Sequence, residues 1–375
     1  MTLGPAEYAA AFVVSVALAW VLTPLMLRLA LRRSILDVPD NRKAQKSPVP
    51  YLGGVAIVLA FSLTVLVAGL LVARTDGVIS LAWVLGAAVV LAVVGLVDDL
   101  RGLNPFIRLA LEIAAGLVVY ATDPGIALPG PQWLDVVITV VWVVGVTNAF
   151  NLLDNMDGLS AGVASIAALT FCLIAGMNGQ FLVAALSAAV AGCATGFLRH
   201  NFHPAKIYMG DAGSLFLGFL LAAIAVRLKL VEAPQTVALF VPVLVLGVAL
   251  FDTTLVTVNR LYHRLNPMSG GRDHMSHRLV WVGIPVPVSV GLIYGLAVSL
   301  GFLGVLLARL DTTSGLMLVG FVLTVGLGTM VLLSAVPVYD SSRQRQAMLR
   351  VVREHELEPL AGASSARAEP GKGVG

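Results

Sequence analysis

Residues 136–158 read VVITVVWVVGVTNAFNLLDNMDG, an uncharged apolar run that ends abruptly in amides and carboxylates. With the residues just before it, the apolar part reaches the length of about 20 residues that a membrane-spanning helix requires. The polar end then holds three asparagines and two aspartates within eleven residues. Because polar groups are costly beside hydrocarbon, such a cluster usually marks a functional site. The stretch therefore predicts a membrane helix with a site at one of its ends.

The composition places the whole chain among polytopic membrane proteins. Hydrophobic residues make up 58% of the 375 residues and charged residues 12%, and the mean hydropathy is +0.92. The apolar runs are long and continuous, whereas a transmembrane barrel would show segments of about 10 residues with alternating polarity. We therefore predict an all-α fold. A formal net charge of +3 suits contact with anionic headgroups and gives no indication of nucleic-acid binding.

Eleven apolar runs of spanning length can be placed along the chain. They cover about 8–29, 51–73, 78–97, 106–121, 132–150, 160–177, 181–198, 212–228, 235–258, 284–308 and 314–335. We expect the first to be a retained helix and not a signal peptide, because a second span follows and no small-residue cleavage pattern is evident. Residues 1–338 are predicted to form one transmembrane domain, and residues 339–375 a basic, disordered cytoplasmic tail.

The basic residues predict the orientation. With the N-terminus outside, all but four of the 24 Lys and Arg residues fall on the inner side; the exceptions are Arg74, Arg227, Lys229 and Arg309. Lys and Arg collect in cytoplasmic connections. We therefore predict a multi-pass protein of the cell membrane, with its N-terminus outside and its C-terminus in the cytoplasm. The polar clusters at 37–50, 98–101, 148–158, 199–211 and 259–278 then all lie on the cytoplasmic face.

Two adjacent acids, Asp98 and Asp99, end the third apolar run. Neighbouring carboxylates repel each other, so they favour either a bound cation or the protonation of one of the two acids. The protonated acid could serve as a base once it has lost that proton. The alternative is a solvated helix end with Arg101 as the counter-ion.

The polar end of the opening stretch has a regular spacing. Asn148, Asn151, Asp154 and Asp157 recur at every third residue, which on a helix would place them on one drifting stripe. Amides and carboxylates in a row offer donors and acceptors for a nucleobase, a sugar or a hydrated metal ion. Asp157 or Ser160 could instead cap the next helix.

Two further segments carry groups suited to phosphate. YMGDAGS at 208–214 combines glycines, a helix start and Asp211, which could hold a divalent cation that bridges phosphates; the alternative is an ordinary helix start. The segment SGGRDHMSHRL at 269–279 contains Arg272, His274 and His277. The two histidines lack the further ligands of a zinc site, so binding of a phosphate or pyrophosphate is favoured.

The ordered set of motifs resembles one known family. Basic residues precede P-x-x-GG at 50–54 and are followed by the adjacent acids, NxxNxxDxxDG, MGDxGSL and a loop with histidines. Over roughly residues 20–335 this is similar to the polyprenyl-phosphate N-acetylhexosamine-1-phosphate transferases, the glycosyltransferase 4 family of membrane enzymes. The resemblance implies a Mg²⁺-dependent phosphotransferase, with Mn²⁺ as a substitute. It would move a sugar 1-phosphate from a UDP-sugar to a polyprenyl phosphate, undecaprenyl or decaprenyl, and release UMP.

The resemblance also implies roles for individual residues. The catalytic residues would be Asp98, Asp99, Asp211 and His274, and the metal ligands would be Asp99, Asp211 and Asn151. The substrate-binding residues would be Lys43, Lys46, Asn148, Asn151, Asp154, Asp157, Arg272 and His277. The product would be the lipid-pyrophosphoryl-sugar that starts the synthesis of a cell-wall or surface polysaccharide.

The last motif bears on the sugar donor. Residues 272–277 read RDHMSH, close to the R-x-H-x-H-H pattern of the N-acetylglucosamine members, with Ser276 where a second histidine would stand. We therefore expect UDP-N-acetylglucosamine as the donor; the alternatives are another UDP-N-acetylhexosamine or UDP-N-acetylmuramoyl-pentapeptide. An ion-coupled transporter is the alternative of another class, but its acids should reach mid-membrane, whereas here they lie at one face. A homodimer is an open alternative for the assembly.

Overall fold

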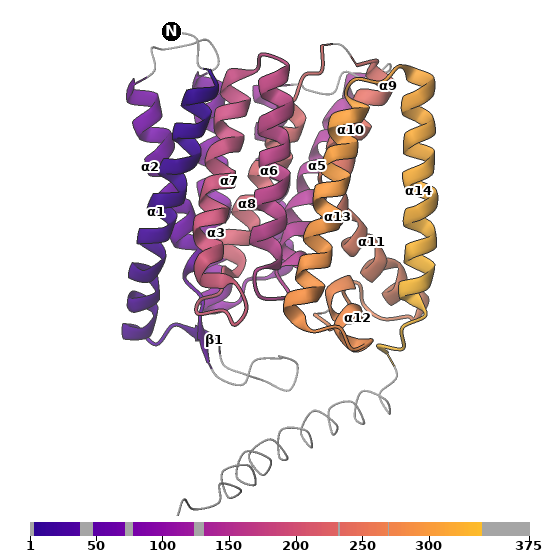
Figure 1. Cartoon of the computed structure of the whole chain (residues 1–375). Coiled ribbons are helices and arrows are strands. Elements are labelled where there is room, and N and C mark those ends of the chain that lie inside the picture. The colour runs from indigo at the N-terminus through magenta and orange to yellow at the C-terminus, as the bar shows by residue number, and fades with distance from the viewer. Residues whose placement is uncertain are drawn as a thin grey trace, which may run out of the picture.

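The computed structural model describes residues 4–37, 48–71, 78–123, 131–231, 233–268 and 270–339. Within them the chain is an all-α bundle with one short two-stranded sheet (Figure 1). The helices are α1 Pro5–Arg32, α2 Gly53–Leu71, α3 Val78–Arg101, α4 Pro105–Thr122, α5 Gln132–Leu153, α6 Leu159–Met177, α7 Phe181–Asn201, α8 Gly210–Arg227, α9 Gln235–Ala238, α10 Phe240–Val245, α11 Gly247–Tyr262, α12 Met275–Trp281, α13 Val286–Leu307 and α14 Thr312–Ser334. Strands β1 Leu36–Asp37 and β2 Val49–Pro50 pair antiparallel. The predicted cytoplasmic tail at 339–375 lies outside the described residues except for its first residue.

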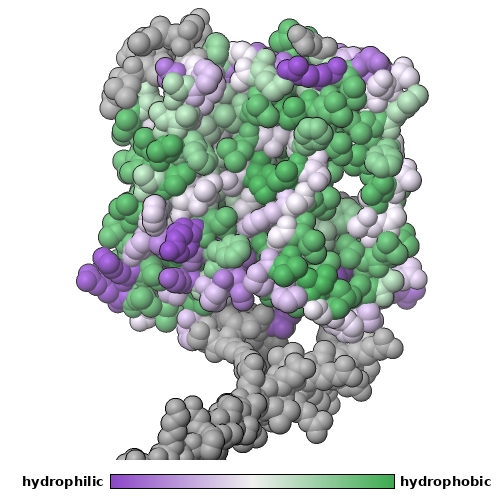
Figure 2. All heavy atoms as spheres, viewed as in Figure 1, coloured by the Kyte–Doolittle hydropathy of each residue, from purple (hydrophilic) through white to green (hydrophobic). Residues whose placement is uncertain are grey.

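The prediction of an all-α polytopic membrane protein is confirmed. Among the described residues, nine helices are long and apolar enough to cross a membrane, or ten if one bent helix pair counts as a single span, and α2 adds a shorter apolar helix. Each of the eleven predicted runs contains at least one helix. Figure 2 shows hydrophobic residues over the middle of the visible face and hydrophilic residues mainly toward its two ends, as a membrane-embedded bundle requires.

The run at 235–258, predicted as one span, is broken by a sharp bend. Its two parts, Gln235–Val245 and Gly247–Tyr262, meet at an angle of 76°. Pro242 lies inside α10 and has no N–H for the helical ladder, and Gly247 begins α11 immediately after the break. A Cβ atom at Gly247 would lie 2.9 Å from Leu300 Cδ1, so the glycine lets α13 approach the bend closely. Apolar periodicity alone does not reveal such a bend.

Helix α8 forms the centre of the bundle. All its residues from Ala212 to Val226 are buried, and it packs against α2, α3, α5, α6 and α7. A helix that is apolar all round belongs in such a position. In contrast, only Gly315 and Val319 of α14 are buried, because this helix contacts the rest of the bundle mainly through α9 and α11.

The helix ends that carry the polar motifs lie together. The C-terminal ends of α3 and α5, the N-terminal ends of α4 and α8, and the short helix α12 all lie at the end of the bundle opposite the start of α1 (Figure 1). The fold therefore gathers segments that are far apart in sequence at one end.

Candidate active site

Asp99 lies against the N-terminus of α8. Its Oδ1 accepts a hydrogen bond from Asp211 N at 3.0 Å and its Oδ2 one from Ala212 N at 3.3 Å. Two glycines permit this approach: a Cβ at Gly95 would lie 2.4 Å from the Asp211 backbone, and Gly210 has a φ of 69°. A carboxylate is well placed here because a helix N-terminus presents free N–H groups and partial positive charge. Asp99 thus caps α8 from the neighbouring helix.

The acids and amides meet at the guanidinium of Arg108. Its Nη1 donates to Asp98 Oδ2 at 3.2 Å and to Asp211 Oδ2 at 3.1 Å. Its Nη2 donates to Asn148 Oδ1 at 3.2 Å and to Asn151 Oδ1 at 3.3 Å. Four helices, α3, α4, α5 and α8, therefore contribute to one group of polar side chains. We call it the Arg108 cluster: Asp98, Arg108, Glu112, Asn148, Asn151 and Asp211.

Arg108 was not among the predicted site residues, since its charge was used only for the orientation of the chain. Asn104 caps α4 by accepting from Phe106 N at 2.9 Å, Pro105 occupies the first helical position, and Arg108 follows one turn later. The structure pairs Asp98 with Arg108, whereas Arg101, the counter-ion considered from the sequence, is exposed.

Glu112 is the second residue that the sequence reasoning missed. Its side chain is 1% exposed, its Oε1 lies 3.4 Å from Arg108 Nε, and its Oε2 accepts a hydrogen bond from Asn148 Nδ2. Glu112 is the one acid in the apolar run at 106–121. An acid within a spanning run is itself a sign of function and could have identified it.

The predicted stripe divides into three environments. Asn148 and Asn151 lie on α5, and Asn151 Nδ2 donates to Asp211 Oδ1 at 2.8 Å. The helix ends at Leu153, so the prediction of one helical stripe is wrong beyond this residue: Asp154 is the C-cap with ψ 48°. Asp157 Oδ2 accepts from Ala205 N at 3.0 Å and lies 2.8 Å from His203 Nδ1, which ties it to the connection before α8.

The predicted cap of α6 is also different. Neither Asp157 nor Ser160 caps this helix; the N-cap is Gly158, whose φ of 77° is in the left-handed region that favours glycine. Gly158 N donates to Asn201 Oδ1 at 3.0 Å, and Gly158 O accepts from Tyr294 Oη at 2.6 Å. The chain can therefore reverse tightly between α5 and α6.

Asp154 lies close to several other acids. Burial, together with the negative charges of Asp211, Asp99 and Asp157, raises its pKa to about 8. A cation near these acids would reverse that effect.

The donor chemistry of the Arg108 cluster fits Mg²⁺. Oxygen atoms of Asp98, Asp211, Asn148 and Asn151 converge on one cationic group, and Mg²⁺ takes oxygen ligands. Among the described residues, however, no group of three or more His, Cys, Asp or Glu side chains is arranged to hold a metal ion. Amide oxygens would therefore have to complete the set of Asp99, Asp211 and Asn151 that the family resemblance implies.

The histidine loop, residues 270–279, contains a second polar group. His274 is 3% exposed and its Nδ1 lies 2.8 Å from Asp252 Oδ2, while Asp252 Oδ1 accepts from Met275 N at 2.6 Å. Asp252 was also missed, although it is an acid inside an apolar run. His277 lies beside His274, with ring centroids 5.7 Å apart, and burial together with the charge of His274 lowers its pKa to about 4. Arg272 is exposed.

Buried ion pairs hold the base of the histidine loop. Arg260 forms two hydrogen bonds with Asp273, at 2.8 and 2.7 Å, and Tyr339 Oη donates to Asp273 Oδ2 at 2.7 Å. Burial opposes ionisation of Asp273, but the hydrogen bonds from Arg260 and Tyr339 outweigh it and lower the pKa. Arg278 Nη1 donates to Leu333 O at 2.7 Å, so the end of α14 also supports the loop.

The polar segment 148–157 and the histidine loop are linked through Asn155. Ser276 Oγ donates to Asn155 Oδ1 at 2.6 Å. The structure thus brings the predicted residues of 148–157 and of the loop to one end of the bundle. Lys43 and Lys46 lie outside the described residues. The segment that follows them is placed beside the MGD motif, since Tyr208 N donates to Pro50 O at 2.7 Å and Gly54 N to Met209 O at 2.8 Å.

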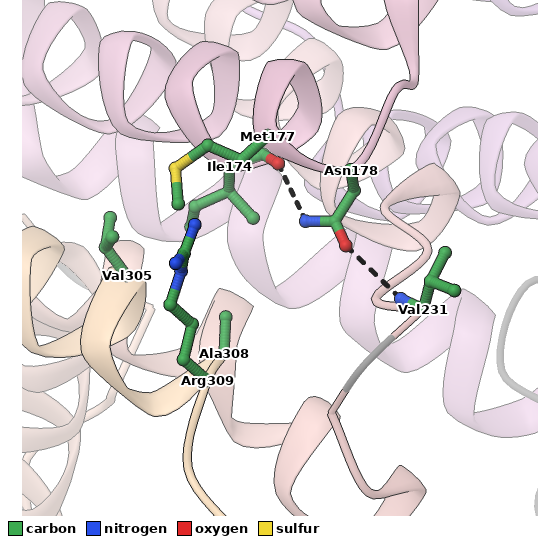
Figure 3. Close-up of a pocket in the computed structure, with 7 residues that line it drawn as sticks. All are labelled: Ile174, Met177, Asn178, Val231, Val305, Ala308 and Arg309. Atoms are coloured by element: carbon green, nitrogen blue, oxygen red, sulfur yellow. Dashed lines mark hydrogen bonds between the residues drawn. The ribbon is translucent and has the colours of Figure 1, made fainter.

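Cavity shape does not identify this site. A cavity of about 210 Å³ lies at the opposite end of the bundle, between Met177 and Asn178 at the end of α6, Val231, and Ala308 and Arg309 after α13 (Figure 3). None of the predicted site residues that the structure describes lines it. A second cavity of about 170 Å³ lies beside the histidine loop and is lined by Arg260, Arg272 and Tyr339 among others.

Comparisons with known proteins agree with the placement of the motifs. The profile of a family described as Glycosyl transferase family 4 matches residues 81–229. A probable undecaprenyl-phosphate N-acetylglucosaminyl 1-phosphate transferase of Bacillus subtilis (strain 168) is 32% identical over 293 residues, 76% of this chain and 80% of the relative. A decaprenyl-phosphate N-acetylglucosaminephosphotransferase of Mycolicibacterium smegmatis is 32% identical over 298 residues, 71% of this chain and 73% of the relative. A phospho-N-acetylmuramoyl-pentapeptide-transferase of Shouchella clausii is 35% identical over 239 residues, 58% of this chain and 73% of the relative.

Proposed function

Because the chain belongs to glycosyl transferase family 4, we propose that it transfers N-acetylglucosamine 1-phosphate from UDP-N-acetylglucosamine to a polyprenyl phosphate. The products would be UMP and a lipid-pyrophosphoryl-sugar. The observation that carries the proposal is the Arg108 cluster, in which oxygen atoms from three helices converge on one cation at a single end of the bundle. Such a site suits two anionic substrates, whose charges must be neutralised before they can approach each other.

The site would lie on the cytoplasmic face, with the N-terminus outside and eleven membrane crossings. The distribution of Lys and Arg supports this orientation, because all but four fall in the segments that the sequence predicts to lie on the side of the site. A lipid phosphate would then reach the Arg108 cluster from the bilayer, while the UDP-sugar would enter from the cytoplasm.

In the proposed reaction, an oxygen of the lipid phosphate attacks the β-phosphorus of the UDP-sugar. The bond from this phosphorus to the oxygen that bridges to the α-phosphate breaks, and UMP leaves with that oxygen. Asp98 or Asp99 would take the proton of the lipid phosphate; Asp98 faces the guanidinium, whereas both oxygens of Asp99 accept backbone N–H groups. Arg108 would hold phosphate oxygens through its planar fork of donors. Mg²⁺, when bound by Asp211, Asn151 and an acid of the pair, would supply charge neutralisation of the pyrophosphate.

The histidine loop would contact the donor from the other side of the site. Asp252 holds Nδ1 of His274, so Nε2 remains to face a phosphate oxygen. The polar groups of 148–157 would contact the nucleotide through amide and carboxyl hydrogen bonds.

A direct assay tests the proposal. Purified protein in detergent would be incubated with undecaprenyl phosphate, Mg²⁺ and radiolabelled UDP-N-acetylglucosamine, and labelled lipid and released nucleotide would be measured. We expect labelled lipid together with UMP, lost in Asp211→Asn and retained in Asp135→Asn, the same change at the other end of the bundle. Release of UDP would contradict the mechanism, because the sugar would then move without its phosphate. Turnover of only UDP-N-acetylmuramoyl-pentapeptide or another UDP-N-acetylhexosamine would keep the chemistry and change the donor.

A further inference from the structure

The contact between Ser276 and Asn155 joins two parts of the site that lie far apart in sequence. Ser276 is 1% exposed, and its Oγ donates to Asn155 Oδ1 at 2.6 Å. A buried hydroxyl requires such a partner, because one left without it loses its hydrogen bond to water and gains nothing. The contact is therefore part of what docks the histidine loop.

Each partner is itself held in place. Asn155 Nδ2 donates to Leu152 O at 2.8 Å, which turns the amide oxygen toward Ser276. Ser276 lies in the first turn of α12, directly between His274, the N-cap of this helix, and His277. Asn155 directly follows Asp154, and burial together with the charges of Asp211 and Asp99 raises the pKa of Asp154 to about 8. A shift at this contact would therefore move the acid side and the histidine side of the site relative to each other.

The two residue types are matched in size. The R-x-H-x-H-H pattern would place a histidine at 276, where an imidazole would have to occupy the position of a hydroxyl that lies 2.6 Å from Asn155. Here a small hydroxyl donor faces an amide acceptor instead.

We infer that Asn155 and Ser276 are a matched pair of positioning residues that sets the distance between the polar segment 148–157 and the histidine loop, and so determines how the UDP-sugar is held. The inference rests on the proposed function. The two walls differ in chemistry: amides and carboxyls face a nucleoside or sugar on one side, while Arg272 and His274 face phosphate on the other. A donor that contacts both walls is sensitive to the distance between them.

The experiment is a double-mutant cycle in the full-length protein with Ser276→Ala, Asn155→Ala and the double variant. The readouts are KM and kcat for UDP-N-acetylglucosamine, and its Kd by calorimetry without the lipid acceptor. Each single variant is expected to raise Kd and KM about tenfold, the effect of one buried hydrogen-bond partner, while kcat changes far less. The double variant is expected to be no worse than either single one. Ser276→Thr, which keeps the hydroxyl, should stay near wild type. Ser187→Ala is the matched control, since this buried serine donates within its own helix.

A size-exchange variant separates positioning from general folding. Ser276→His alone should raise KM more than Ser276→Ala does, because the imidazole also collides with Asn155. Ser276→His with Asn155→Gly should relieve the collision and return KM to about the level of Ser276→Ala. Unchanged Kd and KM in Ser276→Ala, strictly additive effects in the double variant, or no lowering of the Ser276→His KM by Asn155→Gly would each overturn the inference. Failure of the proposed function looks different: the wild-type protein would then neither bind nor turn over any UDP-sugar.

Discussion

The Arg108 cluster and the histidine loop both hold charged side chains at one end of the bundle, but they differ in how these side chains are supported. The Arg108 cluster is built from the ends of spanning helices, and the side chains of Asp98, Arg108 and Asp211 are 18–32% exposed, although Glu112 behind them is buried. The histidine loop is held by ion pairs that are nearly fully buried, with Arg260 and Asp273 at 2% and 5% exposed. The helices of the first region are rigid through apolar packing, whereas the loop depends on polar contacts for its shape. The two regions should therefore fail in different ways when mutated.

The largest expected effect is on the stability of the histidine loop. Arg260→Met would leave the Asp273 carboxylate buried without its ion-pair partner, and removing one partner of a buried pair typically costs about 3–5 kcal/mol. We expect a clear loss of thermal stability in detergent, measured as a lower Tm. Tyr339→Phe, which removes one hydrogen bond to the same carboxylate, should cost only about 1 kcal/mol. Equal losses from the two variants would contradict the ion pair as the main support.

Arg108→Ala should instead act on activity. Without the guanidinium, Asp98 and Asp211 face each other with no compensating charge, and the donor that the proposed mechanism directs toward the phosphate is lost. Loss of one such group typically lowers kcat by about 10²–10³-fold. The measurement is lipid product formation, and Arg101→Ala is the matched control because this exposed arginine lies at the end of α3. If Arg101→Ala proved as damaging as Arg108→Ala, the counter-ion role of Arg108 would be wrong.

Glu112 should have a smaller effect that depends on the replacement. Glu112→Ala removes both the acceptor for Asn148 and the charge beside Arg108, so we expect kcat/KM to fall about tenfold through misplaced partners. Glu112→Gln keeps an amide oxygen for Asn148 and should recover part of the loss. Steady-state kinetics of both variants at equal folded concentration make the comparison. Identical losses would mean that the charge, and not the hydrogen bond, is what matters.

The two regions also differ in how far the sequence predicts them. Asp98, Asn151 and Asp211 interrupt apolar runs at their ends, so their positions along the chain already place them at one membrane face. Arg108 could not be assigned in the same way, because its partners come from three other helices and only tertiary packing brings them within reach. A basic residue at a helix end is also explained by the orientation of the chain in the membrane, so its position in the sequence did not indicate a role in the cluster.

The histidine loop was predicted less completely because its supports are not local. His274 and Arg272 stand out in the sequence, but Asp252 lies in a run that is predicted to be one membrane span. A 76° bend separates α11 from the helix before it. Asp252 on α11 then contacts His274, which lies 22 residues further along the chain. The roles of Arg260 and Tyr339 could likewise not be predicted, because they depend on contacts with Asp273 that the tertiary fold creates.

The smallest expected effect concerns the dependence of stability on pH in the histidine loop. Burial lowers the pKa of His277 to about 4 in the folded protein, against about 6.5 in an unfolded chain. The unfolded state therefore binds the proton more readily, so stability falls as the pH drops below about 6.5 and continues to fall toward about 4. At pH 5.5 the loss should be on the order of 1 kcal/mol. His277→Gln cannot gain this charge, so its Tm should decrease less than that of the wild type between pH 7.5 and pH 5.5. If the Tm of the two proteins decreased equally, His277 would protonate in the folded protein as readily as in the unfolded chain. The histidine loop would then expose His277 to water instead of burying it.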